Sequence, residues 1–338
     1  MSAVQSALSK KRSQTLDVLR GVAILIVVIA HAMQYAVLPG EESLLWMRFI
    51  RPFQMPLLFL ISGWALAFSF PPRSNAVFLR KKVERLFVPY VVWMLVMYAI
   101  SVLSGSDDFS IAGLWHEFVE SDFWFLRALF LNYAVVWIGL LVWSKWFKEK
   151  KWGPLVVVIM GLVLVLLLRK IDLLRPTANG WFYQWFLTGY LAHVFVNKYS
   201  DRVALWMAKH GVRVAMVSAV ILVALVVSVY FCNLSQNLVA YLSIPCICML
   251  VVICVDRIPA VFSRLLAHWG GISLSIYAIH FCHFISVSAR HVGLVEDWPF
   301  AARVLLFSVA WMLGCELLNW LFMKTGITRV LLLGEAKK

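Results

Sequence analysis

Charged residues are scarce in this sequence, and acidic ones are the scarcest. Only 14% of its 338 residues are charged, with 17 Asp and Glu against 31 Lys and Arg, whereas soluble domains usually carry about 25%. Apolar residues make up 62% of the chain, which is more than a soluble domain of this size can bury. The composition excludes an ordinary soluble domain and predicts an all-α, polytopic integral membrane protein.

Cysteine is also rare. The six cysteines, Cys232, Cys246, Cys248, Cys254, Cys282 and Cys315, show neither CxxC nor His-rich spacing. Disulfide frameworks and zinc sites usually show such regular spacing. We therefore expect no disulfide framework and no metal site.

The formal net charge of +14 raises the question of whether the protein binds nucleic acid. No polar stretch in the sequence is long enough to form a domain that reads a groove. Basic loops beside anionic lipids are instead what a protein with many spans needs to fix its orientation. We expect membrane lipids, and no nucleic acid, among its partners.

Long apolar runs are abundant, and a run of about 20 residues crosses the roughly 30 Å of hydrocarbon in a bilayer. We predict about ten membrane-spanning helices, at 16–38, 46–70, 84–104, 122–143, 152–169, 180–196, 211–231, 236–255, 271–289 and 299–322. The sixth contains Gln184 and His193, so it is either a tilted span or a partly re-entrant helix.

Lysine and arginine concentrate in alternate connecting segments, and loops rich in them stay in the cytoplasm. The basic segments lie near 10–12, 73–85, 145–151, 198–213, 257–264 and 324–338. This pattern predicts a multi-pass protein of the cytoplasmic (inner) membrane with both termini in the cytoplasm. We divide the chain into an N-terminal tail (1–15), a transmembrane domain (16–322) and a C-terminal tail (323–338).

The first apolar segment also resembles a signal peptide, because basic residues precede it and Ala30, His31 and Ala32 imitate a cleavage site. Removal of the segment would reverse the fit of every later loop to the positive-inside pattern. We therefore predict that this segment is retained as a membrane helix.

This segment, LDVLRGVAILIVVIAHAMQY (16–35), contains Asp17, Arg20 and His31. Titratable groups at the centre of a membrane helix cost about 2.5–3.5 kcal/mol each, so they are usually paired or functional. A separation of eleven residues places Arg20 and His31 on one helical face, roughly 16 Å apart. Asp17 is three residues from Arg20 and suits an ion pair. Snorkelling of Arg20 to the headgroups and a structural hydrogen bond of His31 are the alternatives.

The Arg20-x10-His31 spacing resembles the signature of the membrane-bound acyltransferase family 3. Four other segments are similar to segments of this family and occur in the same order: FQMPLLFLISG (53–63), FLRKKVERLFVPY (78–90), SDFWFLRALF (121–130) and GISLSIYAIH (271–280). The resemblance implies transfer of an acyl group, usually acetyl, from cytoplasmic acyl-CoA to a hydroxyl of a cell-surface or lipid-linked carbohydrate. Acetyl-CoA or another acyl-CoA is then a co-substrate, and no permanently bound cofactor is implied.

The resemblance also places His31 at the family's essential histidine and Arg20 at its partner arginine. The chain departs from the family pattern at two positions. Lys82 stands where an arginine is usual, which keeps the charge but loses the bidentate grip on phosphate. Gln54 stands where a histidine is frequent, which removes one candidate acid or base and leaves His31 more isolated.

Acyl transfer to a hydroxyl requires a base, because a sugar hydroxyl is a weak nucleophile at neutral pH. A histidine has the appropriate unperturbed pKa, near 6.5. We therefore predict His31 and Arg20 as catalytic residues. We expect the phosphates of acyl-CoA to meet Arg20, Arg80, Lys81, Lys82 and Arg85.

For the acceptor we predict contacts from Trp124, Arg127, Tyr277 and His280. The alternatives are a position of Trp124 at the membrane interface and a structural hydrogen bond for His280.

Two other classes of protein fit parts of the sequence. A glycan or lipid transporter could use Arg20 and His31 to line a polar path, although no pair of broken helices in matching halves supports it. A non-catalytic membrane sensor could retain the fold, although it would have no need of both residues.

Overall fold

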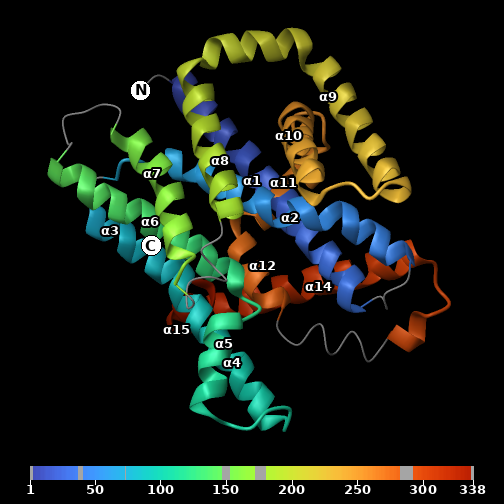
Figure 1. Ribbon diagram of the computed structural model, residues 1–338. Coiled ribbons are helices and arrows are strands. Elements are labelled where there is room, and N and C mark those ends of the chain that lie inside the picture. Colours follow the sequence, from blue (N-terminus) through green and yellow to red (C-terminus); the bar gives the residue numbers. More distant parts are fainter. Residues whose placement is uncertain are drawn as a thin grey trace. The chain divides into compact units, whose positions relative to one another are not determined.

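The computed structural model describes residues 3–36, 41–72, 74–146, 153–171, 180–281 and 292–335. Regular structure in these ranges is entirely helical (Figure 1). The helices are α1 (Ala3–His31), η1 (Ala32–Ala36), α2 (Glu41–Ala67), α3 (Asn75–Lys82), η2 (Val83–Phe87), α4 (Val88–Leu103), α5 (Ile111–Glu120), α6 (Trp124–Trp146), α7 (Gly153–Leu168), α8 (Gly180–Lys198), α9 (Ser200–Phe231), α10 (Gln236–Cys254), α11 (Ala260–Gly271), α12 (Ser273–His280), η3 (Val292–Val295), α14 (Phe300–Met323) and α15 (Gly326–Leu333).

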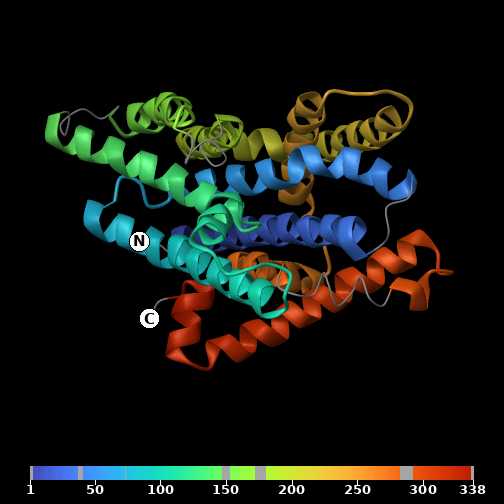
Figure 2. The same ribbon diagram turned by 60° about the horizontal axis from the view of Figure 1, so that its bottom comes forward.

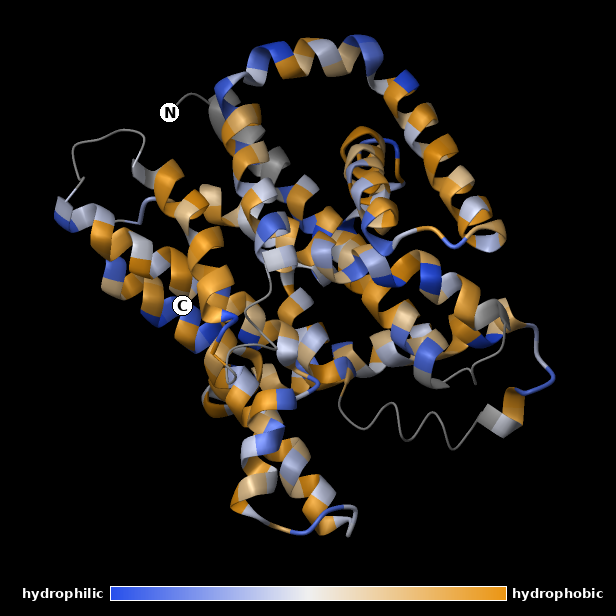
Figure 3. Ribbon diagram, in the orientation of Figure 1, coloured by the Kyte–Doolittle hydropathy of each residue, from blue (hydrophilic) through white to orange (hydrophobic). Residues whose placement is uncertain are grey.

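Seven helical segments in the described ranges are long and apolar enough to cross a membrane, and apolar residues run along their length (Figure 3). They are Gln14–Gln34, Leu44–Ala67, Asn75–Leu103, Trp124–Trp146, Ser200–Phe231, Gln236–Cys254 and Phe300–Met323. Each overlaps a predicted span, which confirms an all-α polytopic membrane protein. The other three predicted spans correspond to the shorter apolar helix α7, to α8 and to α12. Residues 282–291, which include the end of the predicted span 271–289, lie outside the described residues.

The chain forms two compact units, each with its own packing. The first contains Met1–Ile61 and Ala192–Gly314, and the second contains Ser62–Leu191 and Cys315–Lys338. In the first unit α1 packs along α11 and also contacts α10 and α12, and α9 packs along α10. Figure 2 shows α1 in dark blue beside α11 in orange. The central helix of the first unit is therefore the one that carries Arg20 and His31.

Two glycines allow α1 and α11 to approach closely. A Cβ atom on Gly21 would overlap the backbone carbonyl of Leu266, and a Cβ atom on Gly270 would overlap the backbone carbonyl of Asp17. Small residues permit such backbone contact between membrane helices. The contact holds the Arg20 region of α1 directly against α11.

In the second unit α6 packs against α7 and α3, and α4 packs against α5 and α15. Trp93 Nε1 donates a hydrogen bond of 2.9 Å to the carbonyl of Leu332, which joins α4 to α15. The Tyr133 hydroxyl donates one of 3.2 Å to the carbonyl of Ser62. These bonds link parts of the unit that are distant in sequence.

Candidate active site

Two histidines from distant parts of the sequence meet in the first unit. His31 is the last residue of α1 and His280 is the last residue of α12. Nδ1 of His31 lies 2.8 Å from Nε2 of His280, and the rings stack with centroids 4.9 Å apart at an angle of 26°. His280 has no exposed surface, whereas His31 is half-buried. The pair therefore has an inner member and an outer one.

The backbone around each histidine fixes its position. The π-helical turn η1 begins at Ala32, directly after His31, and such turns are frequent at functional sites. On α12, Nδ1 of His280 lies 2.8 Å from the carbonyl of Tyr277 and 3.0 Å from that of Ile276. Both ring nitrogens of His280 are thus engaged, one with backbone and one with His31.

Arg20 pairs with Asp17, as the spacing predicted. Arg20 Nη1 lies 3.1 Å from Asp17 Oδ1, and the two side chains are 28% and 31% exposed. Because α1 is continuous from Ala3 to His31, Arg20 lies on the face of His31 about three turns toward the N-terminus. Arg20 is therefore oriented by a local ion pair and remains accessible.

The other predicted phosphate ligands lie in the second unit, at the end of α3 and in η2. Arg80, Lys81 and Arg85 are exposed, whereas Lys82 is half-buried. Lys82 Nζ lies 3.7 Å from the centroid of the Tyr133 ring, a cation–π contact. Arg20 belongs to the first unit, so a phosphate site shared by Arg20 and these residues stays a prediction.

Arg127 holds the end of α5. Its guanidinium donates to the backbone carbonyls of Phe118 and Val119, and its Nη1 lies 3.3 Å from the Tyr90 hydroxyl. The last carbonyls of a helix lack partners within it, and a cation satisfies them well. Arg127 therefore has a structural role, and acceptor binding by it stays a prediction.

The same end of α5 is electrostatically suited to a cation. Partial burial raises the pKa of the Glu117 carboxyl, and the negative charge of Asp122 raises the pKa further.

Trp124 begins α6, and its ring centroid lies 5.1 Å from that of Phe182. Trp124 is half-buried, so part of its ring surface is available for a further contact.

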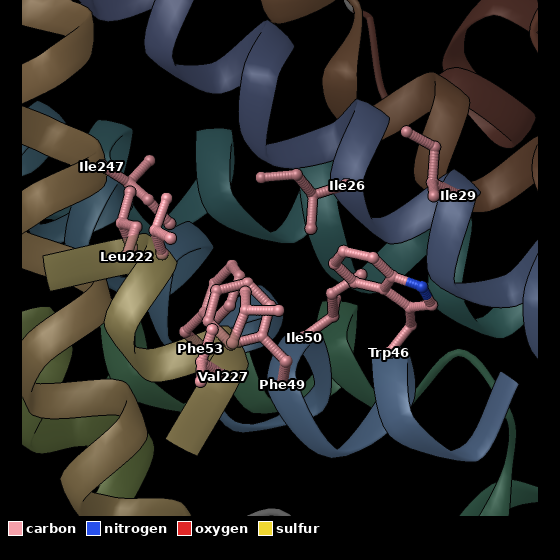
Figure 4. A pocket seen from close by; sticks show the side chains of 11 residues that line it. Ile26, Ile29, Trp46, Phe49, Ile50, Phe53, Leu222, Val227 and Ile247 are labelled. Carbon is pink, nitrogen blue, oxygen red and sulfur yellow. The ribbon is translucent and has the colours of Figure 1, made fainter. Parts of the chain in front are cut away.

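An apolar cavity of about 460 Å³ lies among α1, α2, α9 and α10 in the first unit. Figure 4 shows Ile26 and Ile29 of α1 on one side of it and Trp46, Phe49 and Phe53 of α2 on the other. Its lining offers no charged group for a phosphate or a carboxylate. The cavity suits hydrocarbon, and the polar chemistry belongs to the histidine pair.

The sequence identified both histidines but not their contact, and it assigned His280 to the acceptor. One signal was available: each histidine lies in an apolar segment, and a polar group in hydrocarbon needs a polar partner. The contact of Lys82 with Tyr133 had no comparable signal, because these residues are distant in sequence.

Comparison with known proteins gives two matches. The family described as an acyltransferase domain matches residues 14–320, which is most of the chain. The nodulation protein NolL of Mesorhizobium japonicum is 22% identical over 138 residues, which cover 38% of this chain and 36% of NolL. No solved structure matches the chain.

Proposed function

Since the chain belongs to the acyltransferase family whose pattern it matches, and is built as a membrane protein, we propose that it transfers an acetyl group from cytoplasmic acetyl-CoA to a carbohydrate hydroxyl. The carbohydrate is a cell-surface or lipid-linked glycan. Transfer of another acyl group from its CoA ester would follow the same chemistry. The observation that carries this proposal is the half-buried His31, held against a second histidine within an apolar helix bundle.

His31 acts as the general base. It accepts the proton of the acceptor hydroxyl as the oxygen attacks the thioester carbonyl, and a C–O bond forms. The C–S bond then breaks, and the CoA sulfur takes the proton from His31. The products are the O-acetylated carbohydrate and CoA with a free thiol, so His31 ends in its starting state.

Arg20 helps to hold the donor. It lies about three turns from His31 on the same face, and its guanidinium can grip a phosphate with two hydrogen bonds. Arg80, Lys81, Lys82 and Arg85 add positive charge on the side where acyl-CoA is supplied. Acyl-CoA is a co-substrate in this reaction, with no cofactor bound permanently.

Aromatic residues are the candidates for contact with the acceptor. Trp124 provides an aromatic face on which a sugar ring can stack, and Tyr277 lies one helical turn before His280. The contacts described for Arg127 favour a role in holding the end of α5. Those of His280 favour a role in supporting His31.

The distribution of Lys and Arg supports an orientation with both termini in the cytoplasm of a cell with an inner membrane. Acyl-CoA is a phosphorylated nucleotide that remains inside the cell. With the N-terminus inside, His31 lies three residues before the outer end of the segment Gln14–Gln34, where a thioester from inside can meet a hydroxyl from outside.

Membrane vesicles of defined sidedness test the reaction and its orientation together. Inside-out vesicles supplied with acetyl-labelled CoA should release free CoA and gain labelled carbohydrate, and sealed right-side-out vesicles should not. The control is vesicles from cells that lack the protein. Uptake of glycan with the thioester left intact would show a transporter instead, and equal labelling of both vesicle types would refute the orientation.

A further inference from the structure

The contact between the two histidines has a direction that the backbone of α12 determines. Nδ1 of His280 faces the carbonyl oxygens of Tyr277 and Ile276, at 2.8 Å and 3.0 Å. A carbonyl oxygen can only accept a hydrogen bond. Neutral His280 therefore carries its proton on Nδ1. An unprotonated Nδ1 would be a hydrogen-bond acceptor facing two carbonyl oxygens, which are also acceptors.

Protonation at Nδ1 leaves Nε2 of neutral His280 as an acceptor. Nδ1 of His31 lies 2.8 Å from this atom, and a hydrogen bond between them requires a proton on His31. Neutral His31 therefore carries its proton on Nδ1, and its lone pair lies on Nε2. The hydrogen bond made by one ring nitrogen of a histidine sets the protonation of the other.

We propose that His280 is a positioning residue that holds His31 in the Nδ1–H tautomer and directs Nε2 of His31 toward the acceptor hydroxyl. The inference rests on the proposed function for its catalytic meaning, but the tautomer is a property of the folded protein. His280 does not touch the substrate, because both of its nitrogens are engaged.

Burial and stacking strengthen this assignment. His280 has no exposed surface, so water does not compete for Nε2. The rings are nearly parallel, at 26°, and Phe281 packs edge-on against both, with centroids 5.3 Å from His31 and 5.7 Å from His280. Phe281 therefore restrains the rotation of the His31 ring, and His280 restrains its protonation.

The histidine pair also stabilises the cationic form of His31 that arises during the reaction. When Nε2 of His31 accepts the hydroxyl proton, His31 becomes a cation with protons on both nitrogens. Its Nδ1–H still donates to Nε2 of His280, so no hydrogen bond is lost. A buried acceptor that is already oriented stabilises charge without rearrangement as it develops.

Nitrogen-15 NMR of histidine-labelled protein in lipid bilayers tests the tautomer directly. In the wild type, His31 should show a protonated Nδ1 and an unprotonated Nε2, assigned by the signals that disappear in His31→Gln. His280→Leu should abolish this pattern, because it removes the acceptor. His280→Gln should retain it, because the amide oxygen can accept at a similar place. Phe281→Leu is the packing control and should leave the tautomer unchanged.

Kinetics provide the second measurement. His280→Leu should lower kcat for transfer by about 10- to 10⁴-fold, the range seen when a histidine loses its orienting partner, with KM for acyl-CoA unchanged. His280→Gln should restore most of kcat. A wild-type His31 protonated at Nε2, or full kcat in a folded His280→Leu protein, would overturn the inference. If the wild type transfers no acyl group, the proposed function fails, and the NMR result alone then decides the tautomer.

Discussion

Individual basic residues on α3 and η2 occupy different environments although they are close in sequence. Lys82 directs its ammonium onto the Tyr133 ring, and Arg80 Nε lies 3.7 Å from a Glu84 carboxylate oxygen. Lys81 and Arg85 are exposed. Charge reversal of Lys82 would therefore disturb packing, and Lys81 and Arg85 are the better probes of phosphate binding.

The double variant Lys81→Glu, Arg85→Glu should weaken acyl-CoA binding by roughly 10-fold or more at low salt, because two attractive contacts with phosphate become repulsive. The loss should shrink as salt rises. Equilibrium binding of acyl-CoA to purified protein measures it. The matched control is Lys209→Glu, Arg213→Glu on α9, two exposed residues with the same spacing of four. Equal affinity of both double variants would refute a phosphate site at Lys81 and Arg85.

Contacts between residues differ in how well the sequence predicts them. The ion pair of Asp17 and Arg20 follows from helical spacing, because neighbours at three residues share a face. His31 and His280 are 249 residues apart, and no local rule relates them. Their contact depends on how α12 packs against α1. The sequence therefore identified both residues as candidates for the site but did not predict that they form a pair.

At the scale of helices, the crossing of α1 and α11 positions the Arg20 end of the site. Gly270 lies against the backbone carbonyl of Asp17, whereas the adjacent Gly271 would place a Cβ in open space. Gly270 is buried and Gly271 is exposed, so alanine at these two neighbouring positions compares a close backbone contact with open space.

Gly270→Ala should destabilise the protein by about 1–3 kcal/mol, because a Cβ against backbone forces α11 away from α1. Transfer activity should fall as the Asp17 and Arg20 pair shifts. Gly271→Ala should stay close to the wild type or gain slightly, because alanine favours a helix. Thermal unfolding in detergent compares the two variants. Equal stability of Gly270→Ala and Gly271→Ala would contradict the close contact of the helices.

The sequence predicted the long helices well and the short ones poorly. Apolar runs identify spans because hydrocarbon requires them, but they say little about where a helix continues into polar residues. Accordingly α1 already begins at Ala3, ahead of the predicted span. The polar connector at 104–122 contains α5, whose start is capped by Ser110 accepting from the amide of Gly113 at 2.9 Å. Short helices of this kind depend on capping and tertiary packing more than on apolar length.

For the whole molecule, composition alone was sufficient to predict a polytopic membrane protein. A chain with 62% apolar residues and repeated runs of spanning length has few soluble alternatives, and the family match over residues 14–320 agrees with this class. The arrangement of helices within each unit was not accessible from composition. It depends on particular contacts such as Gly21 with Leu266 and Tyr133 with Ser62, which bring together residues distant in sequence.

The central claim is that His31 is the base in acyl transfer. The most direct measurement is the single-turnover rate of acetyl transfer by correctly inserted His31→Ala, with acyl-CoA affinity measured on the same preparation and His116→Ala, an exposed histidine of α5, as the control. We predict a rate about 10²- to 10⁴-fold below the wild type, unchanged acyl-CoA affinity and a normal rate for His116→Ala. Transfer by His31→Ala at the wild-type rate would contradict the claim and leave His31 as a structural partner of His280.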